Sequence, residues 1–115
     1  AKDRPFVCSV ALNYGGRAEL VHSVKAIAQK VKDGEISVDD INEELISQNI
    51  YTSGQPDPDI IVRPSGEYRL SNFLTWQSAY SEFWFSDILW PDFTTADVDS
   101  VLEDYQKRHR RFGGV

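Results

Sequence analysis

The sequence of 115 residues contains no methionine, one cysteine and two histidines. The single thiol, Cys8, excludes a disulfide framework and a zinc site built from several cysteines. His22 and His109 are too few and too scattered for a histidine-based metal centre. The absence of methionine fits two origins, which are a trimmed initiator residue or a chain that begins inside a longer protein.

Long apolar runs are lacking as well. The longest, residues 6–12, is interrupted by Ser9 and is far shorter than the roughly 20 residues needed to span a bilayer. The first residues carry no signal-peptide pattern. A hydrophobic fraction of 41% with 26% charged residues argues against disorder. We therefore expect a soluble intracellular chain that forms one domain or part of one.

Positive charge is in deficit, because 12 lysines and arginines face 18 aspartates and glutamates. The resulting net charge of −6 and a pI of about 4.8 argue against a general nucleic-acid binder, which needs a basic field. One basic run, residues 107–111, stands against this trend. We interpret it as a solvated helix end, with contact to nucleic acid or anionic lipid as the alternative.

The hydrophobic periodicity predicts the order β-α-α-β-α-β-α. The strands are expected over residues 6–12, 60–62 and 83–85. The helices are expected over residues 17–32, 37–49 and 71–81, and from Thr94 or Thr95 towards the C-terminus. Strands that alternate with helices predict an α/β fold with a mainly parallel central sheet flanked by helices. In such sheets, ligands bind beyond the carboxyl ends of the strands.

Three groups of apolar residues are expected to be buried. Val38, Ile41 and Leu45 form the inner stripe of the second helix, and Cys8 is an inert thiol within the first strand. The aromatic residues of the second half are Phe73, Trp76, Tyr80, Trp84, Trp90 and Phe93. We interpret them as core, and a pocket for an apolar ligand tail is the alternative.

The segment of residues 63–73 offers the clearest chemistry, because it follows a strand and leads into a helix start. Arg63 and Arg69 can each donate two parallel hydrogen bonds, and Gly66 allows a ligand to approach the backbone closely. Ser71 adds a hydroxyl, and a helix start adds free N–H groups. These donors suit a diphosphate. Surface arginines that pair with Glu67 across a turn are an equally weighted alternative.

Two further positions could support such a site. The junction of residues 13–17, with Asn13 and Arg17 at its ends, could face an anion, although a tight turn that requires glycine is the better interpretation. Glu82 precedes a strand, and a carboxylate near a phosphate can hold Mg²⁺. A solvated carboxylate is the alternative for Glu82.

Four blocks resemble the cis-prenyltransferases, especially the bacterial undecaprenyl diphosphate synthases, also called isoprenyl transferases. The blocks are residues 11–17, residues 59–74 with 76–77 and 79–82, residues 89–93, and residues 110–114. The second block is the most specific. The resemblance spans essentially the whole chain and implies the fold of that family.

The resemblance implies a reaction and roles for particular residues. Such enzymes add isopentenyl diphosphate to an allylic diphosphate such as farnesyl diphosphate, with Mg²⁺ as cofactor. Arg63, Arg69 and Ser71 would grip the isopentenyl diphosphate head group, and Glu67 would orient the arginines. Glu82 would hold Mg²⁺.

The resemblance also implies partners and a location. The family works as a homodimer, in which an element like Arg111 and Gly113 reaches the partner's active site. The product would be a polyprenyl diphosphate such as undecaprenyl diphosphate, the lipid carrier of cell-wall synthesis. The resemblance also implies a cytoplasmic enzyme that contacts the inner membrane face transiently and has no nucleic acid as partner.

The chain departs from the family in two ways. Pro64 stands where the family usually has threonine, which removes a backbone N–H. The family's Asp-Gly-Asn-Gly-Arg loop, which binds the allylic diphosphate and supplies the catalytic aspartate, has no counterpart. We therefore expect residues 1–115 to be the C-terminal part of one cis-prenyltransferase domain, inactive alone. A non-catalytic accessory subunit is the alternative, and the upstream sequence would distinguish the two.

Overall fold

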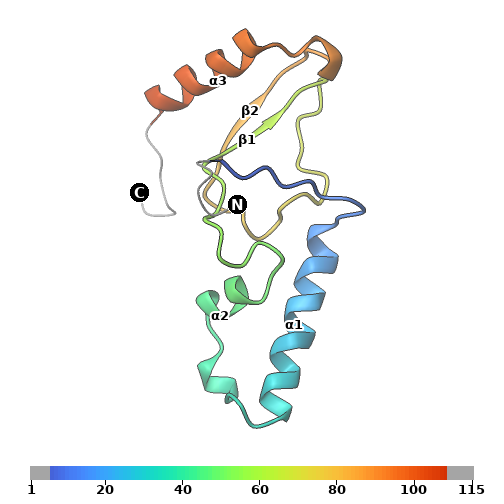
Figure 1. Ribbon diagram of the computed structural model, residues 1–115, viewed down its shortest axis with the longest axis vertical. Helices are drawn as coiled ribbons and strands as arrows, with labels where there is room; N and C mark the ends of the chain where they lie inside the picture. Colours follow the sequence, from blue (N-terminus) through green and yellow to red (C-terminus); the bar gives the residue numbers. More distant parts are fainter. Residues whose placement is uncertain (1–5, 109–115) are drawn as a thin grey trace.

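The computed structural model describes residues 6–108 (Figure 1). The elements in chain order are α1 (Gly16–Lys32), a 3-10 helix (Val38–Asp40), α2 (Glu43–Gln48), β1 (Ile60–Arg63), β2 (Glu82–Phe85), a second 3-10 helix (Trp90–Asp92) and α3 (Thr95–Lys107). Helices α1 and α2 lie together at one end of the molecule, and the two strands and α3 lie at the other (Figure 1). The expectation of parallel strands flanked by helices is confirmed.

Strands β1 and β2 are parallel neighbours, as the sequence predicts. Ile60 pairs with Glu82, and Arg63 pairs with Phe85. Ile61, in the middle of β1, is one of the few apolar residues that are fully buried. The carboxyl ends of both strands therefore lie at the same edge, where Arg63 leads into the next loop.

The expected strand over residues 6–12 is wrong. This segment is extended but pairs with no strand among the described residues, and Phe6 and Leu12 are 85% and 83% exposed. Cys8 is exposed rather than buried. A continuous apolar run becomes a core strand only when neighbouring strands cover it and satisfy its backbone groups. The described part of the chain supplies no such neighbour.

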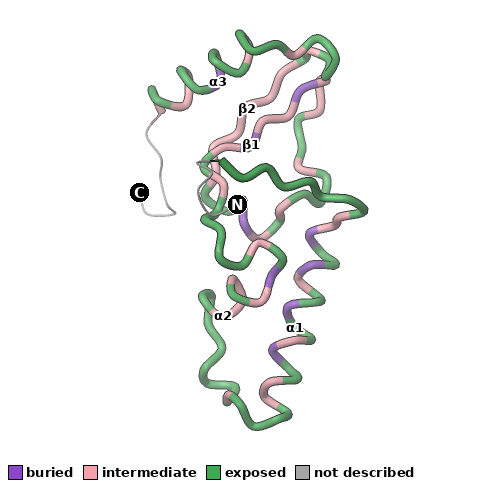
Figure 2. Tube along the Cα trace, viewed as in Figure 1, coloured by how far each residue is buried: buried purple, intermediate pink, exposed green. Residues whose placement is uncertain are grey.

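Helix α1 matches the expected helix, and the side of it that is buried is not its most apolar side. The buried residues are Gly16, Glu19, Ser23 and Ile27, all on one side of the helix (Figure 2). Val21 and Val24 are 53% and 62% exposed. A polar and small-residue face thus packs against the rest of the molecule.

The expected helix over residues 37–49 is two short pieces. Ser37 and Asp40 form a capping box, but it starts only a 3-10 turn. Asn42 then accepts a hydrogen bond from the Leu45 N–H and starts α2 afresh. Val38 and Ile41 are exposed, so the predicted buried stripe is wrong. The chain becomes extended at Ile41, which breaks the helical periodicity on which that stripe depended.

The expected helix over residues 71–81 is also wrong, because this segment is a series of turns. Ser71, Asn72 and Leu74 have φ values of 50°, 67° and 47°, which a right-handed helix excludes. The Asn72 carbonyl accepts a hydrogen bond from the Gly16 N–H at 2.7 Å. Asn72 therefore completes the start of α1 instead of a helix of its own.

The aromatic cluster does not form one core. Phe73 and Tyr80 are 41% and 47% exposed, because without a helix they share no buried face. Trp84 and Phe93 do pack edge-to-face, with ring centroids 6.2 Å apart. The expectation of a shared core is therefore wrong for Phe73 and Tyr80 and holds in part for the later aromatics.

Helix α3 begins where the sequence predicts. The Thr94 side chain accepts from the Asp97 N–H, and the Asp97 carboxylate accepts from the Thr94 N–H, which forms a capping box. Val101 anchors the helix, with 3% of its surface exposed. Phe112, which was expected on this helix, lies outside the described residues.

A buried carboxylate joins α1 to two loops. Glu19 is 1% exposed and accepts hydrogen bonds from the Tyr14 hydroxyl, from the Tyr51 N–H at 2.8 Å and from the Gln77 amide at 3.1 Å. The same Gln77 nitrogen donates to Thr52 Oγ1. All donors to the carboxylate are neutral groups, so hydrogen bonds compensate for its lost hydration.

Removal of this carboxylate should destabilise the fold. We expect Glu19→Ala to lower the free energy of unfolding by about 2–4 kcal/mol, because three donors lose their acceptor in a buried site. Urea denaturation of the protein measures the change. The exposed Glu103 provides the matched control, since Glu103→Ala should stay within about 0.5 kcal/mol of the parent. Equal effects of the two substitutions would show that the Glu19 network contributes little.

The Tyr14 hydroxyl gives a pH-dependent signature. Burial, followed by the hydrogen bond to Glu19, raises the pKa of Tyr14 from its ordinary 10.0 to about 12. Its contribution to stability is therefore complete below pH 10 and is lost as the pH rises from 10 to about 12. Tyr14→Phe should make the alkaline fall in unfolding free energy shallower. Tyr51→Phe, which keeps the backbone N–H that binds Glu19, should retain the parent slope. Identical slopes for all three proteins would contradict the assignment.

Candidate functional site

The loop after β1 is fastened to the loop after β2. The Ser65 N–H donates to the Ile88 carbonyl at 2.7 Å, and the Gly66 N–H donates to the Ser86 carbonyl at 2.8 Å. Ser65 and Gly66 both have positive φ values, which turns the loop sharply. These two N–H groups are therefore not available to an anion at this edge.

The proline that departs from the family pattern lies on the inner side of this loop. Pro64 is fully buried, and it does not line the neighbouring cavity. Its missing N–H therefore takes no donor away from that cavity. The positions that offer donors, Arg63 and Ser71, lie on either side of it in the sequence.

A cavity of about 320 Å³ lies at the carboxyl end of β1. It is lined by Ile61, Val62, Arg63, Leu70, Ser71, Phe73 and Trp90. One permanently charged donor and one hydroxyl thus share a cavity with apolar walls. Such a combination suits a ligand with an anionic head and an apolar body.

The second arginine lies beside this cavity rather than in it. Arg69 forms an ion pair with Glu67, and its carbonyl accepts a hydrogen bond from Arg63 Nη1 at 2.7 Å. The structure thus brings Arg63, Glu67 and Arg69 together, and the pair across the turn coexists with the cavity. The Arg69 side chain is 69% exposed, which leaves it accessible to a ligand.

A tyrosine ties this loop to its neighbour from outside. The Tyr68 hydroxyl donates to Asp87, and this hydrogen bond raises the pKa of Tyr68 above its usual range. The Tyr68 ring also lies 5.7 Å from the ring of Phe85 at the end of β2. Side-chain contacts therefore reinforce the backbone bonds between the two loops.

The glycine-rich junction before α1 requires glycine through close packing against Asn72, since the backbone of Gly15 itself is extended, with a φ of −147°. The N–H groups of Gly16 and Arg17 donate to the carbonyl and side-chain oxygens of Asn72, so the helix start is already capped. Asn13 has a φ of 50°, and a Cβ on Gly15 would lie 2.9 Å from the Asn72 amide nitrogen. The Arg17 residue itself is exposed.

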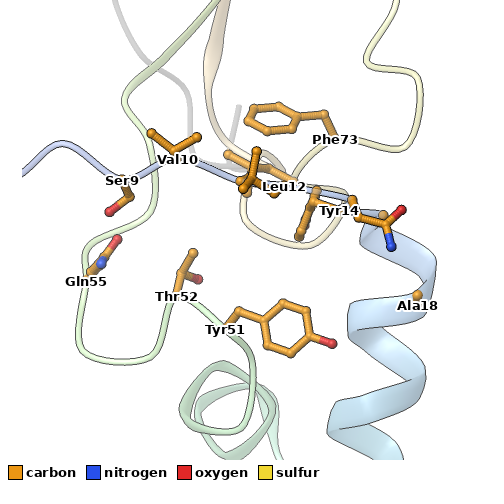
Figure 3. A pocket seen from close by; sticks show the side chains of 13 residues that line it. Ser9, Val10, Leu12, Tyr14, Ala18, Tyr51, Thr52, Gln55 and Phe73 are labelled. Atoms are coloured by element: carbon orange, nitrogen blue, oxygen red, sulfur yellow. The ribbon is translucent and has the colours of Figure 1, made fainter.

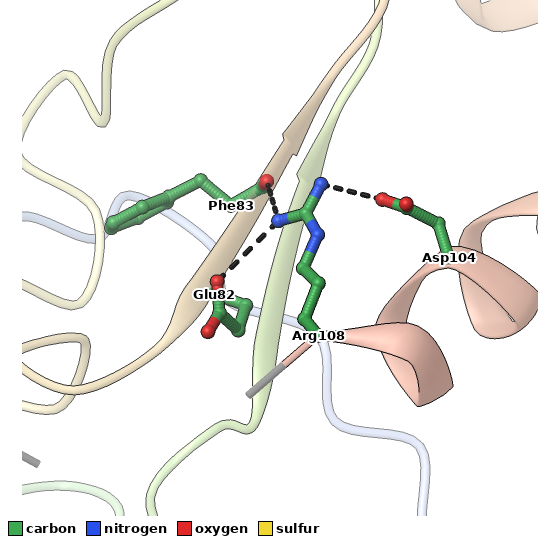
Figure 4. A network of polar contacts seen from close by, with 4 residues as sticks. All are labelled: Glu82, Phe83, Asp104 and Arg108. Atoms are coloured by element: carbon green, nitrogen blue, oxygen red, sulfur yellow. Dashed lines mark hydrogen bonds and ion pairs between the residues drawn. The ribbon is translucent and has the colours of Figure 1, made fainter. Parts of the chain in front are cut away.

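The expected metal ligand, Glu82, lies at the other end of the strand pair from Arg63, because it is the first residue of β2. Its Oε2 contacts Arg108 Nη1 at 3.5 Å (Figure 4). Arg108 also donates to the Phe83 carbonyl at 2.7 Å and to Asp104 in α3 at 2.5 Å. Arg108 thus fastens the end of α3 to the start of β2 through Glu82.

The residues described do not form a metal cage, since no group of three or more histidine, cysteine, aspartate or glutamate side chains gathers among residues 6–108. Magnesium, however, often takes one or two carboxylates and completes its shell with phosphate oxygens and water. Glu82 offers one such carboxylate, but it lies at the end of the strand pair away from Arg63 and does not line the cavity that contains Arg63 and Ser71. Its Oε1 takes no part in the contact with Arg108.

A larger cavity of about 630 Å³ lies between the extended segment 9–15, the start of α1 and the loop at residues 51–55 (Figure 3). Tyr14 contributes an aromatic wall, with its ring 5.8 Å from Phe73 and 6.4 Å from Tyr51. Phe73 lines this cavity as well as the smaller one. Sequence reasoning missed Tyr51 and Glu19 because no motif marks them. Tyr14 stood within the block at residues 11–17, but no role was assigned to it.

Arg111 and Gly113, expected to reach a partner's active site, lie outside the described residues, as does most of the basic run. Within residues 6–108, no helix combines the length and the apolar character needed to cross a bilayer.

Comparison with known proteins identifies the family. The family model described as putative undecaprenyl diphosphate synthase matches residues 1–113. An isoprenyl transferase of Clostridium perfringens is 60% identical over 109 residues, which cover 95% of this chain and 43% of that protein. An isoprenyl transferase of Heliobacterium mobile is 53% identical over 115 residues, which cover 100% of this chain and 44% of that protein. The chain thus spans less than half the length of these relatives.

Solved structures agree with this assignment. Lavandulyl diphosphate synthase from Lavandula x intermedia, in complex with dimethylallyl diphosphate, matches 87% of this chain and 43% of its own, with a TM-score of 0.83 and 43% identity. A probable undecaprenyl diphosphate synthase from Campylobacter jejuni matches 89% of this chain and 45% of its own, with a TM-score of 0.71 and 32% identity. The chain belongs to the undecaprenyl diphosphate synthase family of isoprenyl transferases.

Proposed function

We propose that the protein containing this chain condenses isopentenyl diphosphate with an allylic diphosphate and releases a polyprenyl diphosphate. The cavity that combines Arg63 and Ser71 with apolar walls at the carboxyl end of β1 carries the proposal. Farnesyl diphosphate is the proposed allylic substrate, and undecaprenyl diphosphate, the lipid carrier of cell-wall synthesis, is the proposed product. Lavandulyl diphosphate synthase, solved with dimethylallyl diphosphate, supports an allylic diphosphate as the second substrate.

The contribution of this chain is to hold isopentenyl diphosphate. Arg63 offers two parallel N–H donors to the diphosphate, and the Ser71 hydroxyl donates a further hydrogen bond. Arg69, steadied by Glu67, adds a second charge at the rim. With the head group fixed, the alkene of the isopentenyl group is presented in one orientation, which lowers the entropic part of the barrier.

In the proposed reaction, a carbon–carbon bond forms between the terminal alkene carbon of isopentenyl diphosphate and C1 of the allylic substrate. The allylic C–O bond breaks, diphosphate departs with its electron pair, and a proton leaves the isopentenyl group. We propose that the catalytic aspartate lies in the part of the relatives that this chain does not span. Residues 1–115 would then be the C-terminal part of one domain.

Magnesium is the proposed cofactor, with Glu82 as a single carboxylate ligand. The ion, when bound, supplies positive charge that favours departure of the allylic diphosphate. The role of this chain is to hold the Glu82 carboxylate in place, to which the neighbouring Arg108 contributes. The remaining ligands would come from substrate oxygens and water.

We further propose a homodimer, in which Arg111 and Gly113 of each chain complete the partner's active site. A cytoplasmic enzyme fits the diphosphate substrates, and transient contact with the inner membrane face fits the lipid product. The chain keeps both arginines and the serine of the proposed site, which favours an enzyme over a non-catalytic accessory subunit.

Loss of the rim arginine should weaken substrate binding. In the full-length protein, Arg69→Ala should raise the KM for isopentenyl diphosphate about 30-fold, equivalent to about 2 kcal/mol, because a charge-assisted contact is lost. Steady-state kinetics at saturating allylic diphosphate measure the effect. Lys25→Ala removes an exposed cation from α1 and should leave KM unchanged. An unaltered KM in Arg69→Ala would remove this residue from the site.

The isolated chain of 115 residues should show no prenyl transfer. The reason is that the proposed catalytic aspartate and allylic site lie outside it. Incubation of the purified chain with radiolabelled isopentenyl diphosphate and farnesyl diphosphate, followed by extraction of labelled lipid, tests this expectation. The full-length protein serves as the positive control. Labelled product from the chain alone would show that the catalytic group lies within it.

A further inference from the structure

A large aromatic side chain stands exposed at the edge of the proposed substrate cavity. Trp90 is 63% exposed, although tryptophan is usually largely covered in a folded protein. It opens the second 3-10 helix, and its side chain lines the cavity that contains Arg63 and Ser71. Other large apolar side chains are exposed too, Leu89 among them, but Trp90 is the one of these two that lines the cavity.

The position of this indole is fixed from two directions. The backbone N–H of Trp90 donates to Ser65 Oγ at 3.1 Å, which ties the backbone of this residue to the loop that follows Arg63. The ring of Phe93 packs against the indole edge-to-face, at a centroid distance of 5.8 Å, and Phe93 in turn packs on Trp84 of β2. Trp90 is therefore a preorganised surface, exposed because nothing in residues 6–108 covers it.

The cavity beside the indole has polar lining residues and apolar lining residues. Arg63 and Ser71 supply its charged and hydroxyl donors, whereas Leu70, Phe73 and Trp90 supply apolar surface. A free inorganic diphosphate would use only the first group. A diphosphate ester with a short hydrocarbon body would use both, and a rigid aromatic wall gives it a large contact at little entropic cost.

We propose that Trp90 is a specificity-determining residue whose indole forms the wall for the five-carbon isopentenyl group. Arg63 and Ser71 hold the diphosphate of the same molecule. The inference rests on the proposed function and adds to it the group that recognises the hydrocarbon part. Trp90 thereby makes the cavity select isopentenyl diphosphate over inorganic diphosphate.

The adjacent residue provides a matched control. Leu89 is 58% exposed, is apolar and precedes Trp90 directly, but it does not line the cavity. A general loss of apolar surface at this edge would affect Leu89→Ala and Trp90→Ala alike. An effect of the indole wall would appear in Trp90→Ala alone, and Trp90→Phe would keep most of the contact.

The test is calorimetric titration of the full-length protein with isopentenyl diphosphate and, separately, with inorganic diphosphate, both without allylic substrate so that no turnover occurs. We expect Trp90→Ala to weaken isopentenyl diphosphate binding about tenfold, since the apolar contact is lost. Binding of inorganic diphosphate should change less than about twofold, because its charged contacts remain. Leu89→Ala and Trp90→Phe should keep a ratio of the two dissociation constants close to that of the parent.

The outcomes separate the inference from the function on which it rests. If the parent protein binds neither ligand and transfers no prenyl group, the proposed function fails. If the parent binds isopentenyl diphosphate but Trp90→Ala leaves the ratio unchanged, only the inference fails. Light scattering of each variant is measured in parallel, and a change of oligomeric state in Trp90→Ala would assign the indole to a subunit interface and overturn the inference. If Trp90→Ala does not fold, Trp90→Leu replaces it. The dissociation constant for inorganic diphosphate divided by that for isopentenyl diphosphate should then fall, and an unchanged ratio would contradict the proposed wall.

Discussion

The arrangement of the chain depends on the hydrogen bonds that a single buried carboxylate accepts. Glu19 lies on α1, yet its donors come from the segment before that helix, from the loop that follows α2 and from the turns before β2. Among residues 6–108, few apolar residues are buried. The hydrogen bonds to Glu19 therefore connect segments that an apolar core connects in other proteins. The Gln77 side chain, whose Oε1 is buried without a partner, lies in the same contact.

The candidate site follows from how the two strand ends are joined. The bonds from Ser65 and Gly66 to the loop after β2 use the backbone donors that many phosphate-binding loops offer to their ligands. In the function that we propose, recognition therefore falls to side chains, above all to Arg63. A guanidinium has a fixed planar geometry and a permanent charge, so such a site selects for shape as well as for charge. This division also explains why a proline at position 64 is compatible with the loop.

The sequence predicted those elements whose signals are local. The β-branched run before Arg63 and the capping box at Thr94 depend on neighbouring residues, and both appear in the structure. The segment at residues 6–12 fails because a strand requires a partner that no local pattern can supply. The expected helix over residues 71–81 is wrong for a related reason. The left-handed backbone of Asn72 is stabilised by contacts with α1, more than 50 residues earlier in the sequence. Glu19 escaped notice because a buried glutamate looks like any surface glutamate until its donors are known.

The start of α1 has a consequence for how this sequence can vary. A Cβ on Gly16 would lie 2.3 Å from Thr75 Oγ1 and 3.0 Å from the Asn72 carbonyl, so no side chain fits without movement of both neighbours. A change at Gly16 alone would therefore be rejected, whatever its polarity. A side chain at position 16 would need two further changes at the same time, a smaller residue at position 75 and a displaced turn at residue 72. The junction thus restricts the chain's evolutionary paths more narrowly than its exposed surface does.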